Sequence, residues 1–232
     1  MKIAMITARG GSKRIPRKNI KDFCGKPIIY YSIKAAFEAG VFDEVMVSTD
    51  DEQIAKISES FGAKVPFLRS EESSNDFATT VDVIEEVLDM YESRGIIFDE
   101  ACCIYPTAPF VTGEKLKQGM KKLVDADAAM PVVAYSFPPL RSVVIADDSI
   151  KPKWPEFMTY RSQDLETLYH DCGQFYCFRV SSFREHRNVI MGKTSPIVMD
   201  ELEVQDIDNE TDWEIAEFKY KYLHRNKKLL DF

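Results

Sequence analysis

The stretch Lys2-Ile-Ala-Met-Ile-Thr-Ala-Arg-Gly-Gly-Ser-Lys-Arg-Ile-Pro-Arg-Lys-Asn19, with Gly25-Lys26-Pro27 shortly after it, decides the fold. Residues 2–7 form a short apolar run that predicts a buried strand, and residues 28–39 predict a helix. The loop between them carries two glycines and a dense set of cations. A strand, a basic glycine-containing loop and a helix, in that order, are typical of the start of a nucleotide-binding α/β unit.

The basic loop, residues 8–19, is the first candidate site. Two readings of it are open: a solvated surface loop, or an anion site. Its five cations contrast with a net charge of −8 for the whole chain, which favours an anion site. Gly10 and Gly11 let the backbone approach a ligand closely, and the surrounding cations and N–H groups suit a polyphosphate. The loop matches neither G-x-x-x-x-G-K-[ST] nor G-x-G-x-x-G, so the nucleotide stays open.

Composition sets the broad class. The chain has 232 residues, 45% of them hydrophobic, which predicts a single domain spanning 1–232. The acidic balance argues against nucleic acid as a partner. No apolar run reaches membrane-spanning length, and the N-terminus shows no signal-peptide pattern, so we expect no membrane association. Five cysteines without a C-x-x-C spacing indicate reduced thiols and a cytoplasmic location.

Strands and helices alternate as far as residue 134. Predicted strands cover 44–48, 64–68, 101–105 and 128–134; predicted helices begin near 52 and cover 79–93 and 116–124. This alternation predicts a doubly wound, mostly parallel sheet covered on both faces. It also gathers the loops 8–19, 48–51, 69–80 and 105–109 at one edge of the sheet, where α/β proteins bind ligands.

The pattern changes after residue 134. Residues 135–169 are rich in proline and aromatic residues and only weakly periodic, which predicts an arm protruding from the sheet. Residues 173–178 predict a strand, placed at the sheet edge, and 195–199 and 203–204 predict two more short strands. Residues 211–223 predict an amphipathic helix opened by Asn209 or Thr211.

The run A-R-G-G-S-K-x-x-P-x-K-N at 8–19, followed by G-K-P, resembles the start of the cytidylyltransferases that activate nonulosonic, sialic-acid-like sugars. The resemblance covers nearly the whole chain and is thinnest across 135–158. It implies catalytic roles for Arg9, Lys18 and Asp208. It also implies a nucleotide site made by Ala8, Arg9, Gly10, Gly11, Ser12, Lys13, Lys18, Asn19, Arg69, Thr79 and Thr80.

Asp206 and Asp208 are the metal candidates. Alternating carboxylates at a strand end point to one side, and two of them facing a polyphosphate suit Mg²⁺. From the residues alone, both are equally readable as caps at a helix entry. The run V-Q-D-I-D before a D-W helix looks like the metal motif of the resembled family, which implies that Asp206 and Asp208 bind Mg²⁺.

A second constellation spans 161–165 and 169–176. R-x-Q-D-L followed by G-x-x-Y is similar to the family's sugar-binding segment. It implies substrate contacts from Arg161, Gln163, Asp164, His170, Gln174 and Tyr176. His170 has three readings: a general base, a substrate contact or a residue that holds the turn. Many sialic acid enzymes have Asn-Gly here, and the His-Asp-Cys-Gly of this chain resembles the branch that acts on pseudaminic acid.

The resemblance therefore implies a Mg²⁺-dependent enzyme that joins CTP to an acidic nine-carbon sugar, and a homodimer built through the arm. Alternatives from the same residues are a legionaminic or N-acetylneuraminic acid substrate, and a UTP- or TTP-dependent sugar-1-phosphate enzyme. An alternative from a different class is a nucleotide-sensing module without activity.

Overall fold

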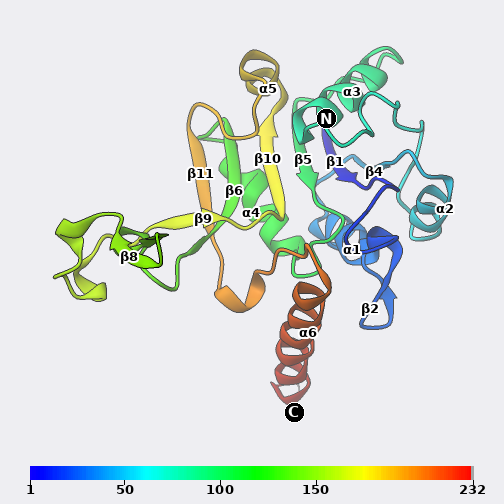
Figure 1. Cartoon of the computed structure of the whole chain (residues 1–232). Coiled ribbons are helices and arrows are strands. Elements are labelled where there is room, and N and C mark those ends of the chain that lie inside the picture. The colour runs from blue at the N-terminus through cyan, green and yellow to red at the C-terminus, as the bar shows by residue number, and fades with distance from the viewer. Residues whose placement is uncertain (231–232) are drawn as a thin grey trace.

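A seven-stranded mixed sheet forms the centre of the molecule (Figure 1). The computed structural model describes the backbone of residues 1–230 and the side chains of residues 1–225. The strand order is β11-β6-β10-β5-β1-β4, with β9 paired to β6. The strands are β1 (Lys2–Thr7), β4 (Glu44–Ser48), β5 (Glu100–Ile104), β6 (Ala128–Ala134), β9 (Tyr169–Asp171), β10 (Phe175–Arg179) and β11 (Thr194–Val198).

Five of the seven strands, β4, β1, β5, β6 and β11, run in the same direction. β4, β1 and β5 pair in parallel register, and so do β6 and β11. β10 lies antiparallel between β5 and β6, and joins the two parallel groups. Side chains alternate between the two faces of β1: Ala4 and Ile6 face one layer of helices, whereas Ile3 and Met5 face the other. The predicted doubly wound, mostly parallel α/β sheet is confirmed.

Helices cover both faces of the sheet. The first face packs against α1 (Ile29–Ala39), α2 (Glu52–Ser60) and α4 (Gly113–Lys122), through residues such as Ile33, Ile54 and Leu116. The second face packs against α3 (Thr80–Glu92) and α5 (Val180–His186), through Ile84 and Phe183. Each face thus has its own buried apolar cluster, as expected for a sheet buried on both sides.

A third apolar cluster seats the long C-terminal helix α6 (Glu210–Leu230) against the segment that follows the basic loop. That segment holds the 3₁₀ turn η1 (Lys18–Ile20) and the small strands β2 (Asp22–Phe23) and β3 (Lys26–Pro27). Trp213 of α6 packs edge-on against Phe23, with ring centroids 5.5 Å apart. Asn209 and Asp212 cap the helix reciprocally, which fixes the residues just before it.

The arm extends away from the sheet, at the left of Figure 1. It contains the hairpin β7 (Val143–Ala146) and β8 (Ser149–Pro152) and the 3₁₀ turns η2 (Pro139–Arg141), η3 (Pro155–Phe157) and η4 (Ser162–Asp164). Phe137 and Ile145 are at least 80% exposed on it. The assignment of 1–232 to one domain stays a prediction, and residues 231–232 lie outside the described part.

Three local predictions were wrong. Residues 64–68 form no strand; Lys64 makes an isolated bridge to Met46, and Pro66 has no N–H with which to extend the pairing. The strand at 173–178 is β10, in the interior of the sheet rather than at its edge. Residues 203–204 end a 3₁₀ turn, η5 (Glu201–Glu203). Across residues 1–230, no helix is long and apolar enough to span a membrane.

Candidate active site

The basic loop is held in one shape by backbone contacts with the neighbouring loop after β4. Ala8 N donates to Ser48 O (2.9 Å), and Gly10 N donates to the Asp50 carboxylate (2.8 Å). The buried Asn19 amide then ties the loop to itself by donating to Arg9 O (2.8 Å). The loop that follows β1 is therefore organised before any ligand arrives.

The two loop glycines differ in their surroundings, and neither has a positive φ. A Cβ built on Gly10 would lie 2.9 Å from Asp51 Oδ2 and 3.0 Å from Asp51 Cβ. Around Gly11, no described atom lies within 4 Å of such a Cβ. Close packing against Asp51 therefore gives a structural reason for glycine at position 10. Ala8, Gly10 and Gly11 do not line the cavity described next.

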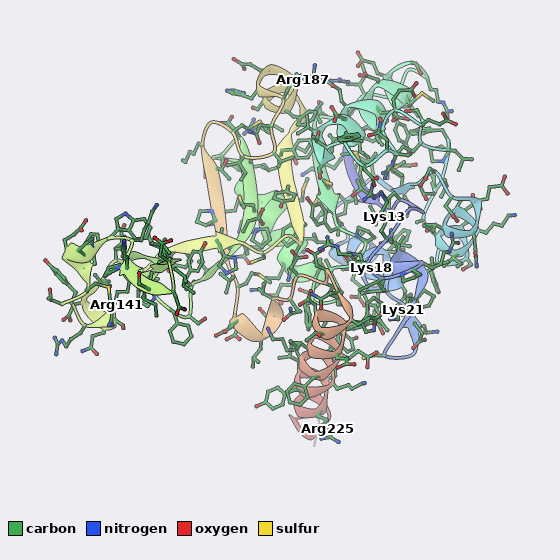
Figure 2. All side chains as sticks on the ribbon, viewed as in Figure 1. Lys13, Lys18, Lys21, Arg141, Arg187 and Arg225 are labelled. Atoms are coloured by element: carbon green, nitrogen blue, oxygen red, sulfur yellow. The ribbon has the colours of Figure 1, made fainter. Side chains whose placement is uncertain are left out.

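A cavity of about 500 Å³ opens at the carboxyl ends of β1 and β5. Lys13 and Lys18 both line this cavity, and Figure 2 shows Lys18 near the start of α6. The predicted loops 8–19, 69–80 and 105–109 all contribute to its wall, and so does Asp208. The predicted residues that line it are Arg9, Ser12, Lys13, Lys18, Asn19, Arg69, Thr79, Thr80 and Asp208.

The cations of this cavity are paired with carboxylates of the chain. Asp76 accepts from Arg9 Nη1 (3.1 Å) and from Lys13 Nζ (2.5 Å). The pKa of Asp76 is lowered, first by the hydrogen bond from Lys13 and then by its charge. Arg14 Nη2 donates to Asp208 Oδ1 at 2.9 Å. Carboxylates of the chain itself thus occupy positions at which the positive charge of the loop favours an anion.

Lys18 is half-buried beside the two metal candidates. Its Nζ donates to Ile207 O at 2.7 Å, between Asp206 and Asp208 in sequence. Burial lowers the pKa of Lys18, whereas the charges of Asp208 and Asp206 raise it. The pKa of Asp206 is raised, first by desolvation and then by Asp208. One ammonium group and two carboxylates therefore share one small region.

Arg69 and the start of α3 form the opposite wall. Arg69 is 8% exposed, and its Nε and Nη2 donate to Ser48 Oγ (2.9 Å) and Ser48 O (2.6 Å). Burial lowers the pKa of Arg69. Thr79 is the N-cap of α3 in a capping box with Asp82, and Thr80 Oγ1 lies 3.2 Å from the Tyr105 hydroxyl. Arg69 is thus held in place by two hydrogen bonds, and the Thr79 hydroxyl already caps α3.

A second cavity, of about 530 Å³, adjoins the residues before α6. His170, Asp171 and Asp206 line it, together with Lys219. The His170 ring packs on Tyr135, with centroids 4.7 Å apart, and its Nδ1 lies 2.9 Å from Asp171 O. Asp206 lines this cavity and Asp208 lines the first, so residues 206–208 stand between the two.

Two predicted sugar contacts are buried behind this second cavity. Tyr176 is 5% exposed, and its hydroxyl donates to Asp171 Oδ2 at 2.5 Å. Burial and the hydrogen bond to Asp171 raise the pKa of Tyr176. Gln174 is 2% exposed; its Nε2 donates to Glu203 O (2.7 Å), while its Oε1 has no partner among the described residues. Neither side chain lines the cavity.

A family model described as cytidylyltransferase matches residues 3–186. A pseudaminic acid cytidylyltransferase of Campylobacter jejuni subsp. jejuni is 37% identical over 97% of this chain and 98% of that protein. The chain belongs to the cytidylyltransferase family. A CMP-N,N'-diacetyllegionaminic acid synthase of Legionella pneumophila is 30% identical over 98% of each chain.

The fold of this cytidylyltransferase is shared by solved structures. A CMP:2-keto-3-deoxy-manno-octonic acid synthetase, solved in complex with CTP, superposes with a TM-score of 0.67. The alignment covers 95% of this chain and 98% of that one, at 18% identity. The likeness establishes a common fold, and it agrees with the sheet order and helical layers described above.

Asp206 and Asp208 are the residues of this cytidylyltransferase that fit a metal ion. Within residues 1–225 there is no group of three or more His, Cys, Asp or Glu side chains placed to hold a metal. Two carboxylates fit Mg²⁺, because Mg²⁺ binds through one or two carboxylates plus substrate phosphates and retained waters. Their position beside a basic cavity is suited to such sharing of ligands.

Arg161, Gln163 and Asp164 are not brought to either cavity of their own chain. They lie on the arm, at and within η4, and Arg161 pairs with Asp164 at 2.7 Å. The sequence-based prediction of a single sugar site containing these residues and His170 is therefore not met within one chain.

Several site residues were missed by reasoning from the sequence. Tyr105, Arg14 and Asp76 belong to the first cavity; Asp171 and Lys219 line the second. Tyr105 is the last residue of the strand predicted over 101–105, at the edge where ligands were expected, so its position indicated a site residue. Lys219 lies on α6, and its position in the helical repeat does not distinguish it from an exposed surface lysine.

Proposed function

We propose that this cytidylyltransferase transfers a cytidylyl group from CTP to an acidic nine-carbon sugar, pseudaminic acid, to give the CMP-sugar and pyrophosphate. The observation that carries the proposal is the pair of adjoining cavities. One is lined by the cations of the 8–19 loop, the other by polar groups, and Lys18, Asp206 and Asp208 stand where the two meet.

The first cavity suits the nucleotide. Arg9 and Lys13 pair with Asp76, and phosphate oxygens offer the same kind of acceptor with more charge. CTP would therefore replace Asp76 at these two cations. Arg69 is rigid and turned to the backbone of residue 48, which suits a wall against ribose or base better than a phosphate clamp.

The reaction requires the anomeric hydroxyl of the sugar to attack the α-phosphorus of CTP. The new bond joins the anomeric oxygen to that phosphorus, the bond to the bridging oxygen of the β-phosphate breaks, pyrophosphate leaves, and the hydroxyl proton is released to solvent. Lys18 lies at the boundary, and its ammonium group would stabilise the charge that builds on the α-phosphate. Binding both substrates in fixed cavities supplies the positioning.

Asp206 and Asp208 would hold a Mg²⁺ ion at this boundary. When bound, Mg²⁺ neutralises polyphosphate charge and favours loss of the hydroxyl proton. Arg14 pairs with Asp208. That contact would have to open for Asp208 to reach a metal ion.

The sugar assignment rests on the 37% identity to a pseudaminic acid cytidylyltransferase over nearly the whole chain. The 30% identity to a legionaminic acid synthase keeps that sugar as the second candidate. We also propose a homodimer built through the arm. Exposed apolar residues such as Phe137 and Ile145 support it, and it would let Arg161, Gln163 and Asp164 act on the partner's sugar cavity.

Steady-state pyrophosphate release tests the proposal. The wild-type protein should release pyrophosphate when given CTP, pseudaminic acid and Mg²⁺, and should release none when UTP replaces CTP. Asp208→Asn should lose nearly all turnover, whereas Glu210→Gln, which removes a surface ion pair with Lys21, should keep it. Activity in Asp208→Asn equal to wild type would remove the metal role, and equal turnover with UTP would refute the nucleotide assignment.

A further inference from the structure

Asp171, the last residue of β9, presents an exposed carboxylate to the second cavity. Both of its oxygens are anchored by the protein. Oδ2 accepts from the Tyr176 hydroxyl at 2.5 Å, and Oδ1 accepts from Gly173 N at 2.8 Å. Gly173 lies in the left-handed region, with φ +59°, so the turn that supplies this N–H depends on a glycine. The carboxylate is therefore fixed in orientation before a ligand binds.

Tyr176 stands behind this carboxylate. It is 5% exposed, and its ring packs edge-on against Tyr105, with centroids 5.7 Å apart. Tyr105 lines the first cavity, whereas Tyr176 lines neither. Tyr176 is buried, and its hydroxyl donates a hydrogen bond to Asp171. Any effect of Tyr176 on a ligand therefore passes through Asp171.

The remaining capacity of Asp171 is for hydrogen-bond donors. An ionised carboxylate has about four lone-pair sites, and Tyr176 and Gly173 occupy two of them. Because Asp171 lines the second cavity, hydroxyl or amide N–H groups of a ligand are suitable partners for the remaining two. A ligand carboxylate would be repelled from this position. Lys219 lines the same cavity, with Nζ 2.8 Å from Val204 O, and offers the opposite charge.

We propose that Asp171 is a specificity-determining residue that accepts hydrogen bonds from hydroxyl or N-acyl N–H groups of the acidic sugar, and that Tyr176 is its positioning residue. Asp171, Glu201 and Asp206 line this cavity, and Lys219 is the lysine among its lining residues, so the sugar enters with its donors toward Asp171 and its carboxylate toward Lys219. This inference rests on the proposed function, because it identifies how the second cavity recognises its substrate.

The test compares Asp171→Asn, Tyr176→Phe, the double variant and the control Asp125→Asn, an exposed aspartate in the loop after α4. Two quantities are measured for each protein. The first is KM and kcat for pseudaminic acid at saturating CTP, from pyrophosphate release. The second is the Kd of pseudaminic acid for protein saturated with CMP, from calorimetry, which needs no turnover.

We expect Asp171→Asn to raise KM and Kd for the sugar about 10- to 100-fold, since the lost bonds involve a charged acceptor. The kcat and the KM for CTP should change less than about threefold, and Asp125→Asn should match wild type. Tyr176→Phe should raise KM for the sugar less, and the double variant should be no worse than Asp171→Asn, since Tyr176 acts through Asp171.

Wild-type KM and Kd in Asp171→Asn would overturn the inference while leaving the proposed function standing. Effects of the two single variants that multiply in the double variant would overturn the positioning role of Tyr176. A wild-type protein that binds the sugar without turnover would refute the proposed function; the inference would then be decided by the Kd of Asp171→Asn. A wild-type protein that neither binds nor turns over the sugar would overturn both.

Discussion

The adjacent glycines of the basic loop provide a matched pair of variants, Gly10→Ala and Gly11→Ala. The same methyl group is added one residue apart, and neither backbone lies in the left-handed region. At Gly10 the methyl group would lie 2.9 Å from Asp51 Oδ2, 3.0 Å from Asp51 Cβ and 3.4 Å from Asp51 Cγ. At Gly11 it meets no described atom within 4 Å.

Asp51 is poorly able to yield. It caps α2 by accepting from Gln53 N and Ile54 N, both at 2.9 Å, and it pairs with Arg17 at 2.5 Å. Overpacking typically destabilises a protein by about 1–3 kcal/mol, and loss of an aspartate cap by about 0.5–2 kcal/mol. We expect Gly10→Ala to lower the free energy of unfolding by ~2 kcal/mol. For a chain of this size that shifts Tm down by roughly 4–8 °C.

Gly11→Ala should leave the free energy of unfolding within ~0.5 kcal/mol of wild type, or raise it slightly, because alanine restricts the unfolded chain. Urea unfolding and thermal scans at neutral pH measure both variants. Gly10→Ala should also raise the KM for CTP, since the loop that moves carries Arg9. Gly10→Ala as stable as wild type, or a loss of stability in Gly11→Ala as large as in Gly10→Ala, would refute the packing explanation.

Three further predictions concern charged groups of the first cavity and its surroundings. Lys18→Met should lower kcat about 100- to 1000-fold, measured by pyrophosphate release, because a preorganised cation is lost at the transferring phosphate; a wild-type kcat would exclude that role. Asp76→Asn should tighten CTP binding about two- to fivefold in calorimetry by removing a competing anion, and unchanged affinity would contradict this. The pKa of Asp51 is lowered below 3.8, chiefly by the hydrogen bond from Arg17. The ionised Asp51 carboxylate therefore stabilises the fold at neutral pH, and this stabilisation is lost as pH falls through the lowered pKa. Asp51→Ala should therefore be ~1–2 kcal/mol less stable than wild type at pH 7, with a smaller gap at pH 3; a constant gap would contradict the linkage.

Local patterns predicted much of the fold. The strand at 2–7, the helix that follows the basic loop and the helix predicted over 79–93 all depend on residues close in sequence. The interior place of β10 did not follow from such patterns. Its continuous apolar run indicates burial on both faces, but pairing with β5 and β6 joins residues more than 40 positions apart. Its antiparallel insertion is a property of the whole sheet.

The position of the first cavity could be predicted from the sheet topology, because the loops after parallel strands gather at one edge of the sheet. Arg9, Lys18 and Arg69 meet there for that reason. The side-chain pairings within the site could not be predicted in the same way. The pairing of Arg9 with Asp76 and of Tyr176 with Asp171 depends on side-chain directions that only the folded chain defines.

The most direct test of the central claim is a competition experiment read by mass spectrometry. The protein is given CTP, Mg²⁺ and equal concentrations of pseudaminic, legionaminic and N-acetylneuraminic acid, and the CMP-sugars formed early in the reaction are quantified. We expect CMP-pseudaminic acid to dominate. A dominant CMP-legionaminic or CMP-N-acetylneuraminic acid would contradict the sugar assignment, and the absence of any CMP-sugar would contradict the proposed reaction itself.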